Sequence, residues 1–197
     1  MTEGGWQLVR YVDDLVVLTK TNTDADQAYH FCRGQLAAMG LTIHPIGEQN
    51  EKGKIKTQIL GRNQPFDFLG LRFNKETVQP ASSKFADLKE RIHTATYTRG
   101  RLATLVQIVE RLNRLLRGWM ASYSFCDIPN DLQKQIDHLA GTGLSIWMRS
   151  HDLIDNINSL SHENRRKIGL WSTTAADIKP LSRRIRRGEA HVPLVVS

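Results

Sequence analysis

Short apolar runs separated by polar breaks dominate the first 80 residues, a pattern typical of strands rather than long helices. Residues 6–11 and 15–18 are two β-prone runs separated only by residues 12–14, which predicts a tight hairpin. Further short strands are expected in three places: residues 41–46, 55–60 and 66–73. This part of the chain therefore predicts a small antiparallel sheet.

One amphipathic helix interrupts the strands. We expect Thr23 or Asp24 to cap it, because either side chain can accept a hydrogen bond from the first helical turn. Apolar or small residues then recur at helical spacing: Ala28, Phe31, Cys32, Leu36 and Met39. Gly40 stands where a helix commonly ends, so the helix is predicted to run from about residue 25 to residue 40.

The pattern changes from strands to helices at Gln79. Ser82 or Ser83 can cap a helix that runs to about residue 97, and a second helix is expected from about residue 101. The second has a broad apolar stripe, which predicts a buried helix: Leu105, Ile108, Val109, Leu112, Leu115, Leu116 and Trp119. Helical stretches are expected at residues 132–139, 145–151 and after residue 161.

These patterns predict an α+β fold in three parts. Residues 1–78 form the small sheet with its helix, residues 79–126 a helical region, and residues 127–197 a helical extension with a basic tail. Residues 182–197 are expected to be poorly ordered.

Composition narrows the class of protein. The formal net charge is +7, and the 197 residues include only two cysteines, too few for a disulfide scaffold. No run of 18 apolar residues and no secretory signal is visible, so we expect a cytoplasmic protein that does not enter a membrane. The positive charge is compatible with a phosphate-rich partner.

The sharpest chemical feature is the run Tyr11-Val12-Asp13-Asp14 at the tip of the predicted hairpin. A turn can direct two neighbouring carboxylates at one ion, and Mg²⁺ prefers oxygen ligands of this kind together with substrate phosphates. The alternative is that two aspartates simply suit a solvated turn.

Three segments, in order, resemble reverse transcriptases of the group II intron type. Residues 10–18 resemble the catalytic hairpin of that family, and residues 66–73 are similar to its next block, a hairpin near the primer end. Residues 112–119 with Tyr123 are similar to the signature of the maturase region, also called the thumb or domain X. The resemblance covers roughly residues 6–125.

The resemblance implies the C-terminal palm and thumb of an RNA-directed DNA polymerase. Asp13 and Asp14 would then bind Mg²⁺ and catalyse nucleotidyl transfer on an RNA template. The remaining expected contacts are with the primer and an RNA/DNA duplex: Tyr11, Phe68, Leu69, Gly70, Arg111, Arg114 and Arg117. Local charge agrees with this, because eight basic residues stand against three acidic ones between residues 84 and 117.

Other conspicuous residues favour structural roles. Trp119 has the helical spacing of a core residue, and Asn113 is expected to bond across helices. The basic clusters at residues 165–167 and 183–187 are equally compatible with nucleic-acid contact and with an ordinary basic surface. No zinc-ligand spacing is present.

The sequence also departs from the family. A further metal-binding aspartate and the fingers come upstream of the catalytic hairpin in such enzymes, whereas only ten residues precede Tyr11 here and none is an aspartate. We therefore expect this chain to be inactive alone and to need a second chain that carries the fingers and upstream palm. The alternatives are a non-catalytic RNA-binding maturase-like module and a truncated remnant.

Overall fold

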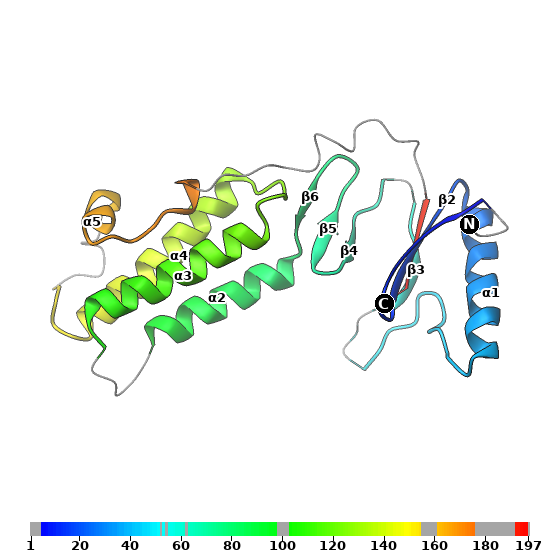
Figure 1. Cartoon of the computed structure of the whole chain (residues 1–197), viewed down its shortest axis with the longest axis horizontal. Helices are drawn as coiled ribbons and strands as arrows, with labels where there is room; N and C mark the ends of the chain where they lie inside the picture. The colour runs from blue at the N-terminus through cyan, green and yellow to red at the C-terminus, as the bar shows by residue number, and fades with distance from the viewer. Residues whose placement is uncertain are drawn as a thin grey trace. The chain divides into compact units, whose positions relative to one another are not determined.

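The computed structural model describes residues 5–51, 53, 55–61, 63–97, 103–154, 161–175 and 192–196 (Figure 1). The chain divides into two compact units, one formed by residues 1–77 with 183–197 and the other by residues 78–182. Most strands lie in the first unit and most helices in the second. This arrangement confirms the predicted α+β class.

The first unit contains a sheet of four strands in the order β1-β2-β7-β3. The predicted hairpin is present, because β1 (Gln7–Tyr11) and β2 (Asp14–Thr19) pair antiparallel with Tyr11 opposite Asp14. Strand β7 (Val192–Val196) lies between β2 and β3 (Thr57–Ile59) and pairs antiparallel with both (Figure 1). The expectation of a poorly ordered tail is therefore wrong for residues 192–196, an apolar and largely β-branched run that supplies an inner strand.

Helix α1 (Asn22–Ala38) packs on this sheet. Its N-cap is Thr21 rather than Thr23 or Asp24. The Thr21 side chain accepts from the Asp24 N–H, and the Asp24 carboxylate accepts from the Thr21 N–H, each at 3.1 Å. The predicted end is confirmed, since Gly40 follows the helix with a φ of 74°.

The core of the first unit lies between α1 and the sheet. Leu15 and Val17 from β2 pack there against residues of α1 and the segment that follows it: Ala28, Tyr29 and Ile43. The strand expected at residues 41–46 is not formed, because only Ile46 makes an isolated bridge, to Thr57. Pro45 lacks an N–H for a strand ladder, which accounts for the difference.

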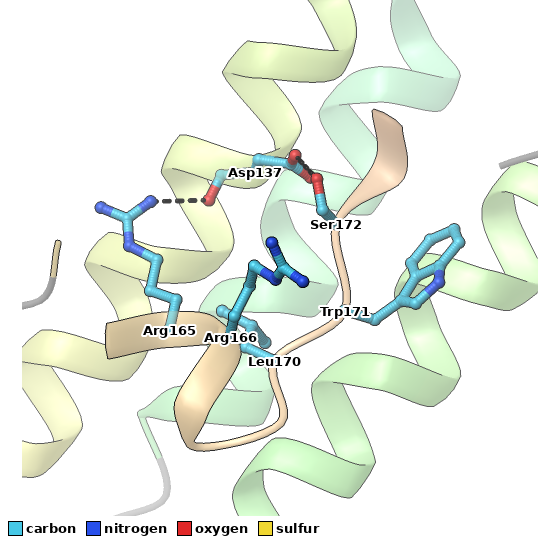
Figure 2. A pocket seen from close by; sticks show the side chains of 6 residues that line it. All are labelled: Asp137, Arg165, Arg166, Leu170, Trp171 and Ser172. Carbon is cyan, nitrogen blue, oxygen red and sulfur yellow. Dashed lines mark hydrogen bonds between the residues drawn. The ribbon is translucent and has the colours of Figure 1, made fainter. Parts of the chain in front are cut away.

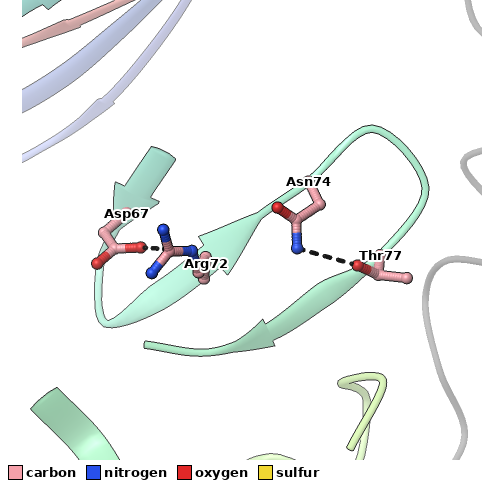
Figure 3. A network of polar contacts seen from close by, with 4 residues as sticks. All are labelled: Asp67, Arg72, Asn74 and Thr77. Atoms are coloured by element: carbon pink, nitrogen blue, oxygen red, sulfur yellow. Dashed lines mark hydrogen bonds and ion pairs between the residues drawn. The ribbon is translucent and has the colours of Figure 1, made fainter. Parts of the chain in front are cut away.

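A second hairpin joins β4 (Phe66–Phe68) to β5 (Leu71–Phe73). Its two turn residues, Leu69 and Gly70, both have positive φ (51° and 76°), as a two-residue type I′ turn requires. The Asp67 and Arg72 side chains approach to 3.9 Å across the hairpin, and Asn74 donates to the Thr77 hydroxyl beyond it (Figure 3).

The second unit begins with β6 (Val78–Pro80) and continues with helices. Helices α2 (Ser82–Thr96), α3 (Leu105–Ser122) and α4 (Asn130–Arg149) lie side by side, followed by α5 (His162–Lys167) and the 3-10 turn η2 (Thr173–Ala175) (Figure 1). Their shared core contains the predicted stripe of α3, and its fully buried side chains come from all three long helices: Leu88, Ile108, Leu112, Leu116, Met120, Ile136 and Leu144.

Helix α4 is continuous, although the sequence suggested two shorter stretches at residues 132–139 and 145–151. It packs in the same unit as α2 and α3, and two glycines inside it have a packing reason. A Cβ on Gly143 would lie 3.0 Å from the Thr96 hydroxyl, and one on Gly141 would lie 2.4 Å from the Arg165 guanidinium. Close approach at these points explains why α4 keeps residues of low helix propensity.

No helix within the described residues is both long enough and apolar enough to cross a membrane.

Candidate nucleic-acid interface

The turn between β1 and β2 presents the predicted acidic pair. Val12 has a φ of 55°, a left-handed conformation that is strained for a β-branched residue. The Arg10 Nε–H donates to the Val12 carbonyl at 2.8 Å and supports this conformation. Tyr11 and Asp13 are exposed and Asp14 is half-buried, so the turn directs polar groups outwards.

The two carboxylates have no competing partner in the described part of the chain. Neither Asp13 nor Asp14 forms a hydrogen bond or ion pair there, so their oxygens are free to bind a cation. These oxygens are of the type that Mg²⁺ prefers. The described residues contain no group of three or more His, Cys, Asp or Glu side chains that could hold a metal. The chain thus offers two carboxylates, and further ligands would have to come from substrate or from another segment.

The hairpin of β4 and β5 is anchored to β2, the strand that follows the acidic turn. Phe68 is buried and packs with Val16 of β2 and with Leu60. Its side chain is therefore a core group and not an exposed contact for a primer, unlike Leu69, which is 45% exposed at the turn beside Gly70. A shared core joins the two predicted active-site hairpins.

A basic stripe lies along α3. Arg111 is half-buried, whereas Arg114 and Arg117 are exposed, and the spacing of three residues places all three on one side of the helix. None forms an ion pair with a described residue. We call Arg111, Arg114 and Arg117 the α3 arginine stripe. Arg99 and Arg101, which contributed to the predicted local charge, lie outside the described residues.

Two other side chains of α3, Trp119 and Asn113, have structural roles, as the sequence predicted. Trp119 is 8% exposed and its indole N–H donates to the Lys84 carbonyl at 3.4 Å. The Asn113 side chain donates to the Gly169 carbonyl at 2.8 Å and accepts from the Trp171 N–H at 2.7 Å. Asn113 therefore bonds to the loop after α5 rather than to a neighbouring helix.

Asp137 of α4 holds the same loop, and sequence reasoning missed it. One carboxylate oxygen accepts from the Ser172 hydroxyl and the other from the Thr173 N–H at 2.8 Å. Together with α5, these residues line a small pocket (Figure 2): Asp137, Arg165, Arg166, Leu170, Trp171 and Ser172. Its cavity volume is about 20 Å³, enough for one water-sized group.

The three side chains of the basic cluster at residues 165–167 have different surroundings. Arg165 is half-buried and donates to the Asp137 carbonyl at 3.5 Å, and Lys167 pairs with Glu163 at 2.9 Å. Arg166 is exposed, and its guanidinium has no hydrogen bond or ion pair to the described residues. The second cluster, residues 183–187, lies outside those residues.

Neither cysteine has the character of a nucleophile. Burial raises the pKa of the Cys126 thiol to about 11, and the Asp127 carboxylate contributes to the shift. Burial also raises the pKa of Cys32. Both thiols therefore stay protonated at neutral pH, as expected of apolar filler residues.

A comparison with known families gives a match in the helical unit. Residues 85–158 match the family model described as the group II intron, maturase-specific domain. The matched residues include most of α2 and all of α3 and α4. No curated protein matches the chain. The family match confirms the resemblance to the C-terminal portion of group II intron-type proteins.

Proposed function

We propose that the helical unit binds structured RNA, because residues 85–158 match the group II intron, maturase-specific domain. The α3 arginine stripe is the observation that carries this proposal. Two exposed guanidinium groups and one half-buried group follow one side of a rigid helix, with no ion pair to a described residue. Arginine binds phosphate oxygens in a bidentate manner, and duplex RNA is recognised largely through its shape and backbone.

Salt-dependent RNA binding tests the proposal. The probe is a fluorescein-labelled RNA stem-loop, and its affinity for the full chain is measured by anisotropy between 50 and 200 mM salt, roughly the range over which phosphate contacts weaken strongly. We expect Arg114→Gln and Arg117→Gln each to weaken binding several-fold. Each should also reduce the slope of log K against log salt by about 0.7 to 0.9, the contribution of one phosphate.

Lys134→Gln is the matched control, since it removes one positive charge from an exposed position on α4. Lys134 lies 3.8 Å from Asp131 and is outside the α3 arginine stripe. Its affinity and salt slope should stay close to those of the unmodified chain. Absence of RNA binding at low salt, or equal losses in all three variants, would show that the stripe does not bind RNA.

A catalytic role is the second candidate, and the strained acidic turn favours it. Asp13 and Asp14 would hold Mg²⁺, which when bound would stabilise charge on the transferring phosphoryl group. The hairpin's own contribution is to fix, at an exposed turn, two carboxylates that have no hydrogen bond or ion pair to a described residue. The site would be completed by a further aspartate and fingers from another segment or a second chain, acting on an RNA template and its RNA/DNA duplex.

Primer extension separates this role from a purely RNA-binding module. With Mg²⁺, primer–template and nucleotides, residues 1–197 alone should incorporate nothing, because the described residues add no third metal-binding side chain to the two carboxylates. A second chain with the missing aspartate and fingers should restore incorporation. Asp13→Asn with Asp14→Asn should abolish the restored activity and leave RNA affinity intact. Restored activity that survives the double substitution would refute a role for the acidic turn.

A further inference from the structure

We propose that the pocket formed by α4, α5 and the loop of residues 168–173 binds a backbone phosphate of RNA, with Arg166 as its main ligand. We call this the α5 pocket. Its α5 and loop residues follow the matched maturase-specific domain, which ends at residue 158. The inference rests on the proposed RNA binding and extends the contact surface beyond the α3 arginine stripe.

The walls of the α5 pocket are fixed by side chains from two long helices. Asn113 of α3 holds Gly169 and Trp171, and Asp137 of α4 holds Ser172 and Thr173. The Thr173 hydroxyl also donates to the Gln133 carbonyl at 3.0 Å. A loop that is already ordered loses little conformational entropy when a ligand binds.

The charge in the pocket favours an anion. Arg165 and Arg166 supply two positive charges, against one negative charge on Asp137. Both Asp137 carboxylate oxygens accept hydrogen bonds from the loop, and no hydrogen bond or ion pair joins Asp137 to the Arg166 guanidinium. In Figure 2, the Arg166 guanidinium lies between Leu170 and Ser172 and faces the pocket. A guanidinium that has no hydrogen bond or ion pair to a described residue is a suitable donor for a phosphate oxygen.

The size of the pocket selects the group that can enter. A volume of about 20 Å³ admits one phosphate oxygen and excludes a nucleobase. Trp171 at the rim continues the surface towards α3, because the Arg117 guanidinium lies over its ring at 5.8 Å from the centroid. Arg117 contacts Trp171, and Arg166 lines the same pocket as Trp171, an arrangement that suits an RNA backbone running from the stripe to the pocket.

Arg166→Gln and Lys167→Gln form a matched pair that tests the α5 pocket. Both remove one positive charge from α5, but Lys167 is ion-paired with Glu163 and does not line the pocket. With the labelled RNA stem-loop, Arg166→Gln should weaken binding about three- to tenfold and lower the salt slope by about 0.7 to 0.9. Lys167→Gln should change the affinity less than about twofold, as expected for an exposed paired charge.

The outcomes distinguish a failure of the pocket proposal from a failure of the proposed RNA binding. If Arg114→Gln weakens binding but Arg166→Gln behaves like Lys167→Gln, the pocket proposal is overturned and RNA binding by α3 stands. If the unmodified chain does not bind RNA, both proposals fail. A DNA stem-loop of the same sequence is the second probe. An Arg166→Gln loss of similar size on both probes supports a phosphate contact, whereas no loss on either overturns it. Circular dichroism should show an unchanged fold, since Arg166 is exposed.

Discussion

Replacing Asn113 with alanine tests how the loop after α5 is held. The substitution removes a donor to the Gly169 carbonyl at 2.8 Å and an acceptor of the Trp171 N–H at 2.7 Å. Each hydrogen bond contributes about 1 kcal/mol net, and the half-buried Trp171 N–H adds part of a desolvation cost. Water can replace the partner of the exposed Gly169 carbonyl. We therefore expect Asn113→Ala to lower the free energy of unfolding by about 1 to 2 kcal/mol.

Urea unfolding followed by tryptophan emission is the suitable assay. Three tryptophans of the helical unit report its unfolding: Trp119, Trp147 and Trp171. Gln135→Ala, which removes an exposed amide from α4, is the control and should stay within about 0.5 kcal/mol of the unmodified chain. Equal stability of Asn113→Ala and this control would refute the assigned role of Asn113.

RNA binding provides an independent readout of the same loop. Asn113→Ala should weaken binding because Trp171 and the wall of the α5 pocket lose their support. Adding Arg166→Gln in that background should then cost less than it does in the unmodified chain, since both changes affect one site. Strict additivity of the two losses would show that Asn113 does not position the pocket.

Three further predictions concern packing and protonation. Leu112→Ala removes a fully buried side chain of α3 and should cost about 3 to 5 kcal/mol in urea unfolding; a loss below about 1 kcal/mol would mean that the site is poorly packed. Gly141→Ala places a Cβ against the guanidinium end of the Arg165 side chain and against no backbone atom within 2.6 Å. The gain of up to about 1 kcal/mol in helix propensity should offset the displacement of that side chain and keep the melting temperature nearly constant, whereas a large drop would contradict this balance. The raised pKa of Cys126 favours the neutral thiol in the folded state, so its contribution to stability is complete below pH 9 and is lost between about pH 9 and 11, while Cys126→Ser should flatten that part of the pH profile.

Local patterns were sufficient to predict the elements nearest the candidate site. The hairpin around Asp13 follows from two β-prone runs with a two-residue turn, and α3 follows from its apolar spacing. The Thr21 cap carried a readable signal as well, because Thr21 and Asp24 have the spacing of a capping box. Thr23 and Asp24 are also favourable capping residues, and they were expected in its place.

The remaining features depend on contacts between residues far apart in sequence. Asp137 reaches Ser172 and Thr173 across 35 and 36 positions, and Asn113 reaches Gly169 and Trp171 across 56 and 58. No periodicity or motif marks such pairs. The packing of Phe68 against Val16 was likewise not predictable from the sequence. The similarity of residues 66–73 to a primer-contacting block did not reveal that Phe68 lies in the core.

The inner position of β7 constrains how the protein is made. Strands β2 and β3 are synthesised early, but the strand that joins them begins only at Val192, after the helical unit. During translation the ribosome must release that whole helical unit before the N-terminal sheet can close. Until then, the nascent hairpin that carries Asp13 and Asp14 has an unpaired edge on β2. Chaperones and strands of neighbouring molecules can bind this edge. Once it has collapsed, the helical unit shortens the effective loop and makes closure of the sheet less costly.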